Sequence, residues 1–337
     1  MVTNDPTTGS RGSGLRGSGL RGSGSVPAGS STRGPRPERS LEFGILGTVE
    51  LRANRRPLNL SSPKQRALLG ACLLNANALV SSDRLVDAIW GEQPPPSAAA
   101  LVQTYVSRLR GLMSPSGPGP IVTRPPGYII VVAPDDLDLH RFERLVAEAG
   151  EAGRRSDHRL AAGLLRTAAA QWRGPALDGL DTPPLRAAAA RLEEMRLAAV
   201  ENRIEAEIQI GVLGDLVAEL TELVAAHPLR ERLHGQLMRT LYRLGRKAEA
   251  VQVYQRTQAG LREALGVDPS PNLQKLHLAM LTENPGLVPA RMPAPTRTPP
   301  PASTPAPAST PAPIRASGPG QRLVEGDAVM PRLDTRP

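Results

Sequence analysis

Cysteine is almost absent from this chain, because Cys72 is the only one in 337 residues. A single cysteine excludes a disulfide framework within the chain and any metal site built from several cysteines. Cys72 lies inside the apolar run Ala-Leu-Leu-Gly-Ala-Cys-Leu-Leu at residues 67–74. These neighbours predict a buried, structural thiol rather than a reactive one.

Long apolar runs are also missing. No stretch of about 18 apolar residues could span a bilayer, and the N-terminal residues lack the apolar core of a secretory signal. The sequence therefore predicts a cytoplasmic protein with no membrane partner.

Motifs typical of enzymes are not found. The phosphate-binding pattern Gly-x-x-x-x-Gly-Lys-[Ser/Thr] is absent. The sequence contains five histidines, His140, His158, His227, His234 and His277. Their positions do not have the spacing of a metal-binding motif. We therefore predict a protein that is not an enzyme and has no cofactor and no metal site.

The two ends of the chain differ in composition from its middle. Residues 1–40 are rich in Gly, Ser and Arg and include a Leu-Arg-Gly-Ser-Gly repeat, whereas residues 285–337 are dominated by Pro, Ala, Ser and Thr. Neither end has enough large apolar residues to form a core, so both are predicted to be disordered tails. About 245 residues remain. At roughly 100 to 200 residues per domain, they predict two domains, 41–133 and 134–284.

Charge is distributed unevenly between these domains. Residues 41–133 contain nine Lys or Arg against five Asp or Glu, a net charge of +4, whereas residues 134–284 contain 20 against 22, a net charge of −2. This difference favours nucleic acid as the partner of the first domain and protein as the partner of the second. Solubility alone is the alternative explanation of the positive charge.

The first domain begins with a strand pattern and continues with helix signals. Residues 41–51 alternate apolar and β-branched residues with glycines, and a turn at 54–56 leads into a short return through Leu58 and Leu60. Ser61-Ser62-Pro63 predicts a capped helix start, and a second helix is predicted to follow Ser81-Ser82-Asp83. We expect a small antiparallel sheet followed by helices.

A third helix is predicted over residues 97–113, and its faces follow from a rotation of about 100° per residue. Val102, Val106, Leu109 and Met113 fall on one narrow arc, which predicts the core face. The opposite strip combines small side chains, hydroxyl groups and one guanidinium, and it comprises Ser97, Ala100, Thr104 and Arg108. Tyr105 and Ser107 flank this strip. Such a strip could enter a major groove, although a solvated helix face is the plainer interpretation.

A β-hairpin with a basic tip is predicted after the third helix. Two β-runs, 121–123 and 128–132, surround Arg124-Pro125-Pro126-Gly127. A sheet, three helices and a C-terminal hairpin together predict a winged-helix α+β DNA-binding domain, in which the hairpin lies near the DNA backbone.

The second domain has apolar residues at helical spacing throughout, and no strand pattern of similar strength. An offset of 34 residues pairs Gly211 with Gly245 and Ile204 with Met238. This offset is the tetratricopeptide period and predicts an all-α, tetratricopeptide-like domain. The repeat unit that follows Pro228 extends to Asp268-Pro269, so its last helix is expected to be elongated.

The sequence resembles the Streptomyces antibiotic regulatory protein family across nearly all of its predicted folded part. The similar motifs are Ser-Pro-Lys-Gln-Arg-Ala-Leu-Leu (62–69), Asp-Arg-Leu-Val-Asp-Ala-Ile-Trp-Gly (83–91), Tyr-Val-Ser-Arg-Leu-Arg (105–110) and Thr-Arg-Pro-Pro-Gly-Tyr (123–128). Residues 138–145, 172–177, 227–233 and 265–269 look like the bacterial transcriptional activation domain. Family members commonly have Asn where Ala100 stands, so a polar contact is expected to be missing there.

The resemblance implies residue roles in DNA binding. Thr104, Tyr105 and Arg108 would face the bases, Arg110 the backbone and Arg124 would act from the wing. Lys64, close to a helix N-terminus, is a candidate phosphate ligand. Arg110 falls only about 40° from the core direction, which weakens its assignment. The complete predicted DNA-binding set is Lys64, Ser97, Thr104, Tyr105, Ser107, Arg108, Arg110 and Arg124.

Five further residues are predicted to be structural. Gly127 and Tyr128 are expected to shape and pack the wing, and Trp90 is expected in the core. Trp172 and Tyr254, aromatic residues at helical spacing, are likewise interpreted as core residues.

The function implied by the resemblance is a transcriptional activator of secondary metabolism, often antibiotic biosynthesis. Such a protein would bind direct repeats in promoter DNA as a homodimer and recruit RNA polymerase holoenzyme through its helical domain. It would be associated with the nucleoid when it is bound to DNA. A repressor with the same DNA-binding fold and a tetratricopeptide-like protein-binding scaffold are the alternatives.

Overall fold

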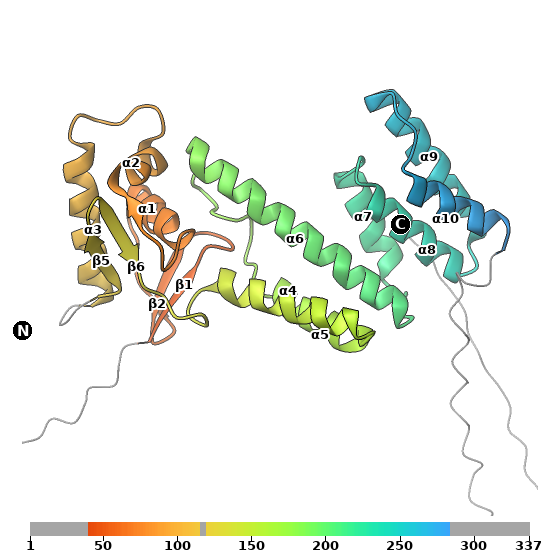
Figure 1. Ribbon diagram of the computed structural model, residues 1–337, viewed down its shortest axis with the longest axis horizontal. Coiled ribbons are helices and arrows are strands. Elements are labelled where there is room, and N and C mark those ends of the chain that lie inside the picture. The colour runs from red at the N-terminus through yellow and green to blue at the C-terminus, as the bar shows by residue number, and fades with distance from the viewer. Residues whose placement is uncertain (1–39, 115–118, 284–337) are drawn as a thin grey trace, which may run out of the picture. The chain divides into compact units, whose positions relative to one another are not determined.

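The computed structural model describes residues 40–114 and 119–283 (Figure 1). The two tails predicted to be disordered, 1–40 and 285–337, therefore lie outside the described residues, apart from Ser40. Within those residues the architecture is the predicted one, a small α+β region followed by a helical region.

A three-stranded antiparallel sheet opens the described chain, in the order β1 (Leu41–Gly44), β2 (Glu50–Ala53) and β3 (Arg56–Pro57). The predicted turn is confirmed, because Asn54 and Arg55 between β2 and β3 have φ of 51° and 64°. Tight two-residue hairpin turns require such left-handed residues.

The three predicted helices of the first domain are present as α1 (Pro63–Leu73), α2 (Ser82–Trp90) and α3 (Ala98–Met113). Ser81 caps α2, since its hydroxyl accepts the N–H of Arg84 at 3.3 Å. The predicted capping hydroxyl of α1 is not observed. Ser62 is the N-cap residue but only its carbonyl is used, accepting the N–H of Arg66 at 3.1 Å.

The predicted wing is confirmed as a hairpin of β5 (Ile121–Arg124) and β6 (Gly127–Ile130). The short strand β4 (Val80–Ser81), not expected from the sequence, pairs with β6 and gives the order β4-β6-β5. Gly127 is required here, because a Cβ atom at this position would lie 1.9 Å from the Val80 carbonyl oxygen. Tyr128 is buried, so both residues shape the wing as expected.

Seven helices make up the rest of the described chain: α4 (Asp138–Arg154), α5 (His158–Ala169), α6 (Pro183–Gln209), α7 (Leu216–Ala226), α8 (Glu231–Arg243), α9 (Lys247–Leu265) and α10 (Pro271–Leu281). The 34-residue offset has a structural counterpart, because Gly211 and Gly245 follow α6 and α8 and both have φ of 78°. The predicted elongation is also observed, since α9 has 19 residues and α7 has 11.

Two large hydrophobic clusters stabilise these elements. The first contains buried residues of the winged-helix region together with those of α4, α5 and the first part of α6, up to Ala199. The second extends from Ile204 on α6 to Met280 on α10. The apolar core is thus continuous across residue 133. Trp172 and Tyr254 are buried in these clusters, as predicted.

Asp138 at the start of α4 connects the N-terminal sheet to the helices. Its buried carboxylate accepts the backbone N–H groups of Ile45 and Leu46 at 3.0 Å and forms an ion pair with Arg173 at 2.9 Å. A second connection is made before α6, where the Thr182 hydroxyl donates to the Ala88 carbonyl of α2 at 2.8 Å. The winged-helix region is therefore attached to the helical region at two separate points.

Candidate nucleic-acid interface

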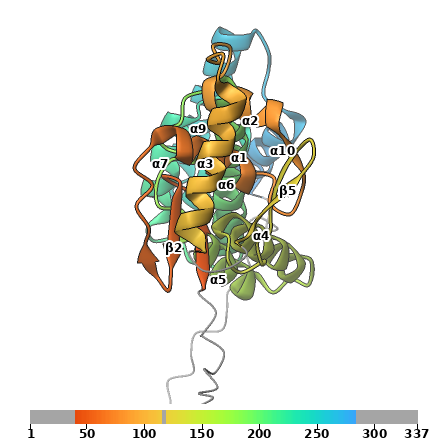
Figure 2. The same cartoon turned by 90° about the vertical axis from the view of Figure 1, so that its left-hand side faces the viewer.

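Helix α3 exposes one face, and the β5–β6 hairpin lies beside it (Figure 2). The predicted core face is confirmed, because Val102, Val106, Leu109 and Met113 are all buried. The predicted outward strip is exposed at Ser97, Ala100, Thr104, Ser107 and Arg108. The amphipathic pattern of the sequence thus placed these side chains on the correct side.

Arg108 is the basic residue at the centre of this strip. It is exposed, and among the described residues its guanidinium has no hydrogen-bond or ion-pair partner. One helical turn earlier, the Thr104 hydroxyl donates to the Ala100 carbonyl at 3.0 Å, which leaves its oxygen free to accept. The strip therefore offers a forked donor beside a hydroxyl acceptor.

Tyr105 is less free than the sequence suggested. Its ring stacks on Trp90 at the end of α2, with a centroid separation of 6.3 Å and an interplanar angle of 26°. Trp90, expected in the core, is only partly buried and packs against it. The pair holds Tyr105 at the border of the outward strip, so its ring position is fixed before any ligand binds.

Arg110 joins α3 to the wing. Its Nε donates to the Ile121 carbonyl at 3.0 Å, and its Nη2 donates to the Thr123 hydroxyl at 2.8 Å. These contacts explain the ambiguous helical phase of Arg110, since it lies between the core face and the exposed strip. Its contact with DNA stays a prediction, whereas its contact with β5 is a feature of the fold.

Arg124 ends β5 and is paired in register with Gly127. Its side chain is exposed and has no partner among the described residues. The tip beside it is held in place, because both the N–H and the hydroxyl of Ser82 donate to the Pro126 carbonyl at 3.0 Å. A cationic side chain is thus presented from a rigid loop.

Lys64 has a partner inside the protein. Its Nζ donates to the Ile89 carbonyl at 2.7 Å and lies 5.8 Å from the centre of the Trp90 ring. The ammonium group therefore stabilises the C-terminal end of α2, where backbone carbonyls carry partial negative charge. Its role as a phosphate ligand stays a prediction with less structural support than those of Arg108 and Arg124.

Sequence reasoning missed the contribution of α2 to this surface. Ser82 in its first turn fixes the wing tip, and Arg84 in the same turn is exposed without a partner in the described chain. The spacing of apolar residues within one segment cannot predict that α2 contacts the β5–β6 hairpin. The pairing of β4 with β6 brings them together.

The described residues show no sign of a metal site or of a membrane-spanning helix. No group of three His, Cys, Asp or Glu side chains there could hold a metal ion, and none of the helices there is long and apolar enough to cross a membrane. Burial raises the pKa of the Cys72 thiol to about 12, in agreement with a structural role.

Two protein families match the chain. The family described as "Transcriptional regulatory protein, C terminal" matches residues 55–130, and the "Bacterial transcriptional activator domain" matches residues 137–281. The regulatory protein DnrI of Streptomyces peucetius is 34% identical over 73% of this chain and 94% of its own length. The chain belongs to the Streptomyces antibiotic regulatory protein family of transcriptional activators. The resemblance noted in the sequence is thus confirmed.

Other relatives of this family member differ in length. The regulatory protein AfsR of Streptomyces coelicolor is 43% identical over 74% of this chain, which spans only 25% of AfsR. A solved structure of Mycobacterium tuberculosis EmbR, in complex with a low-affinity phosphopeptide, matches with a TM-score of 0.70 and 34% identity. That match covers 73% of this chain and 66% of EmbR.

Proposed function

We propose that this family member binds promoter DNA sequence-specifically and activates transcription of a secondary-metabolite gene cluster. The observation that supports it most is the exposed strip of α3, with the unpartnered Arg108 at its centre and a wing held at a fixed position beside it. A helix presented in this way fits the major groove of B-DNA.

Base recognition is assigned to α3. Arg108 has the forked donor geometry that pairs with the O6 and N7 acceptors of guanine. Thr104 and Ser107 have hydroxyl groups that can donate to or accept from base edges, and Ala100 and Ser97 are small enough to allow close approach. Tyr105, fixed by Trp90, adds an aromatic edge at the border.

Backbone contacts are assigned to the wing and to α2. Arg124 at the wing tip and Arg84 in the first turn of α2 are exposed, basic and without partners in the described chain. Phosphate contacts of this kind fix the orientation of a protein on the duplex and make its affinity salt-dependent.

The helical region is assigned to protein contacts. Its stacked helices and its family membership support homodimerisation on paired direct repeats and recruitment of RNA polymerase holoenzyme. The rigid attachment of α4 to the N-terminal sheet would carry the position of the bound promoter over to this region.

The DNA-binding proposal is tested in two steps. Selection from genomic fragments would first yield a preferred site, and gel-shift titration would then compare this site with a scrambled duplex of equal length at several salt concentrations. We expect the preferred site to bind at least about 10³-fold more tightly, with an affinity that falls steeply as salt rises. Equal affinity for both duplexes would contradict sequence-specific binding.

Activation is tested separately by transcription in vitro with purified polymerase holoenzyme. Added protein should raise the transcript yield from a template that carries the selected site. A lowered yield would identify a repressor with the same DNA-binding fold, and an unchanged yield would favour a scaffold.

A further inference from the structure

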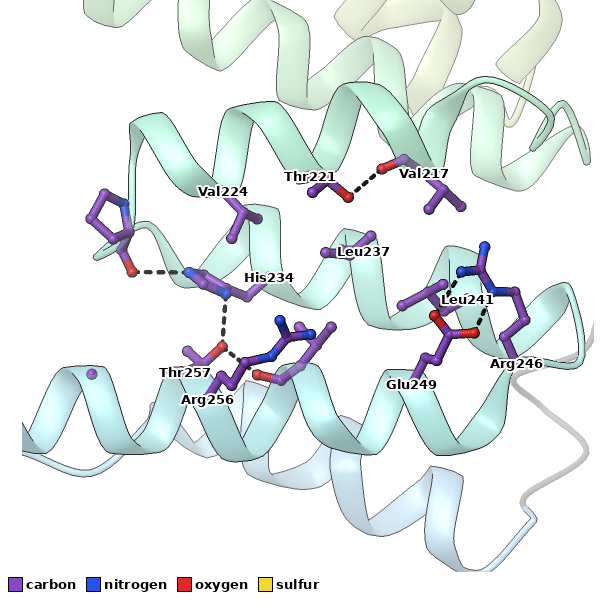
Figure 3. Close-up of a pocket in the computed structure, with 13 residues that line it drawn as sticks. Val217, Thr221, Val224, His234, Leu237, Leu241, Arg246, Glu249, Arg256 and Thr257 are labelled. Atoms are coloured by element: carbon purple, nitrogen blue, oxygen red, sulfur yellow. Dashed lines mark hydrogen bonds and ion pairs between the residues drawn. The ribbon is translucent and has the colours of Figure 1, made fainter.

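A groove lies between α7, α8 and α9 on the tetratricopeptide-like region, with a volume of about 380 Å³ (Figure 3). Its walls are mainly apolar side chains from all three helices, which include Val217, Val224, Leu237, Leu241 and Val253. Gly260 on α9 lines one end, and no side chain fills the space in front of it. The groove is thus suited to an extended peptide with apolar side chains.

The groove has one positive charge without a carboxylate partner. Arg246 and Glu249 neutralise each other through hydrogen bonds of 2.7 and 2.6 Å. Arg256 reaches into the groove from α9 (Figure 3), and its Nε donates a 3.4 Å hydrogen bond to the Gln252 carbonyl. Its terminal nitrogens have no partner among the described residues.

Two further polar residues of the groove already have partners. His234 Nδ1 lies 2.7 Å from the Thr257 hydroxyl, and His234 Nε2 lies 2.9 Å from the Pro228 carbonyl. The groove therefore selects for a ligand that combines apolar side chains with a carboxylate aimed at Arg256.

The chain leaves the described region beside this groove. Glu283, at the C-terminal edge of the described residues, pairs with Lys247 at 2.9 Å. Lys247 is the first residue of α9 and follows Arg246, which lines the groove. In addition, α10 packs against α8 and α9, two of the three helices that form the groove.

One segment of the C-terminal sequence has the required chemistry. Residues 323–330 read Leu-Val-Glu-Gly-Asp-Ala-Val-Met, in which two acidic residues are flanked by four large apolar ones. Residues 285–337 contain only one other acidic residue, Asp334. Thirty-nine residues, 284–322, connect Glu283 to Leu323. At about 3.5 Å per residue they can span well over 100 Å, so chain length does not limit access.

We infer that residues 323–330 bind in the groove of the same chain, with Glu325 or Asp327 at Arg256 and the apolar residues against the groove walls. The connection through residues 284–322 favours this occupant over a separate peptide of the same chemistry, because it keeps the local concentration of the segment high. A separate acidic peptide from another protein would have to displace the segment first.

The test is photo-crosslinking of the full-length protein with p-benzoylphenylalanine in place of Val324. Equal amounts of unlabelled and ¹⁵N-labelled protein are mixed before irradiation, and the crosslinked peptides are identified by mass spectrometry. We expect crosslinks from residue 324 to the groove residues of α7, α8 and α9. The two crosslinked peptides should carry the same isotopic label, because they come from the same chain. Mixed-label crosslinks, crosslinks to other elements or no crosslinks would each overturn the inference.

Charge reversal then tests the assigned ion pair. Arg256→Glu should lower the crosslink yield about five-fold, because attraction is replaced by repulsion at an exposed pair. Adding Glu325→Arg and Asp327→Arg should restore it. Arg159→Glu, at an exposed position without a partner on α5, is the matched control and should change nothing. If Arg256→Glu behaves like this control, Arg256 does not hold the segment. The result does not depend on DNA binding, so it is independent of the proposed function.

Discussion

Asp138 and Arg173 form an ion pair of 2.9 Å that joins the start of α4 to the segment after α5, and the aspartate side chain is fully buried. The same carboxylate accepts backbone N–H groups of Ile45 and Leu46, and Arg173 continues to Glu50 on β2 at 3.1 Å. Buried charges of this kind are tolerated because hydrogen bonds and an opposite charge replace their hydration. The pair therefore fixes the N-terminal sheet against the helices.

Replacing Asp138 by Asn should destabilise the protein strongly. An amide has one accepting oxygen in place of two, and it leaves the Arg173 guanidinium without its buried counter-charge. We expect the free energy of unfolding to fall by about 3 to 5 kcal/mol, measured by urea denaturation.

The control for this change is Asp135→Asn. Asp135 also pairs with an arginine, Arg144, but its side chain is 76% exposed. Exposed pairs contribute about 1 kcal/mol or less, so this variant should unfold close to the wild type. Similar losses for both variants would show that the buried pair contributes no more than a surface one.

Much of the α3 surface was predictable from the sequence, because the direction of a helical side chain follows from its position alone. Once Val102 and Val106 are assigned to the core, Arg108 and Thr104 must face outward. The wing was predictable for a similar reason, since two β-runs around a Pro-Pro-Gly segment have few alternatives to a hairpin.

Contacts between distant segments were not predictable in this way. Asp138 lies 93 residues from Ile45, and a polar residue in an otherwise helical pattern gives no sign that it will be buried. The sequence likewise gives no sign of the hydrogen bond between Lys64 and Ile89 or of the stacking of Trp90 on Tyr105. Such pairs depend on how the elements pack, which local periodicity does not encode.

Arg110→Ala should loosen the wing. The change removes two hydrogen bonds from α3 to β5 and should lower the free energy of unfolding by about 1 to 2 kcal/mol. DNA affinity should fall on both specific and random duplexes, because Arg124 is no longer held at a fixed position. Arg110→Lys separates geometry from charge, since lysine keeps the charge but lacks the fork. A lysine variant with wild-type stability would rule out the geometric role.

Arg108→Ala should affect specificity without affecting the fold. Because Arg108 has no partner in the described chain, the thermal midpoint should stay at the wild-type value. Affinity for the selected site should fall by about 1 to 3 kcal/mol, and affinity for random DNA should change much less. Fluorescence anisotropy on both duplexes measures the difference. An equal loss on both would assign Arg108 to the backbone instead.

Arg124→Ala should give the opposite pattern. A phosphate contact from the wing carries no sequence information, so specific and random DNA should be weakened by similar factors. The slope of log affinity against log salt should also become shallower by about one unit. The same titrations that test Arg108 provide this comparison. A loss confined to the selected site would instead place Arg124 at a base.

Stability should depend on pH through two histidines of the helical region. Burial lowers the pKa of His234, which sits between the Pro228 carbonyl and the Thr257 hydroxyl, and burial also lowers the pKa of His277, which stacks on Tyr254 at 3.9 Å. The unfolded chain therefore binds protons at a pH where the folded chain does not. Stability should be fully present above pH 6.5, the ordinary pKa of histidine, and should fall as the pH drops below it.

Urea denaturation at pH 7.5, 6.5 and 5.5 measures this effect, with a slope of at most about 1.4 kcal/mol per pH unit for each histidine. His234→Gln should reduce the slope, and adding His277→Gln should reduce it further. His227→Gln, at an exposed position after α7, controls for the loss of an imidazole. Burial acts to raise the pKa of Glu205, but the hydrogen bond and the charge of Arg239 lower it, and the net shift is downward. Carboxylates of this kind therefore contribute to the pH dependence only at more acidic pH. If the double variant retained the wild-type slope between pH 7.5 and 5.5, other groups would have to account for it.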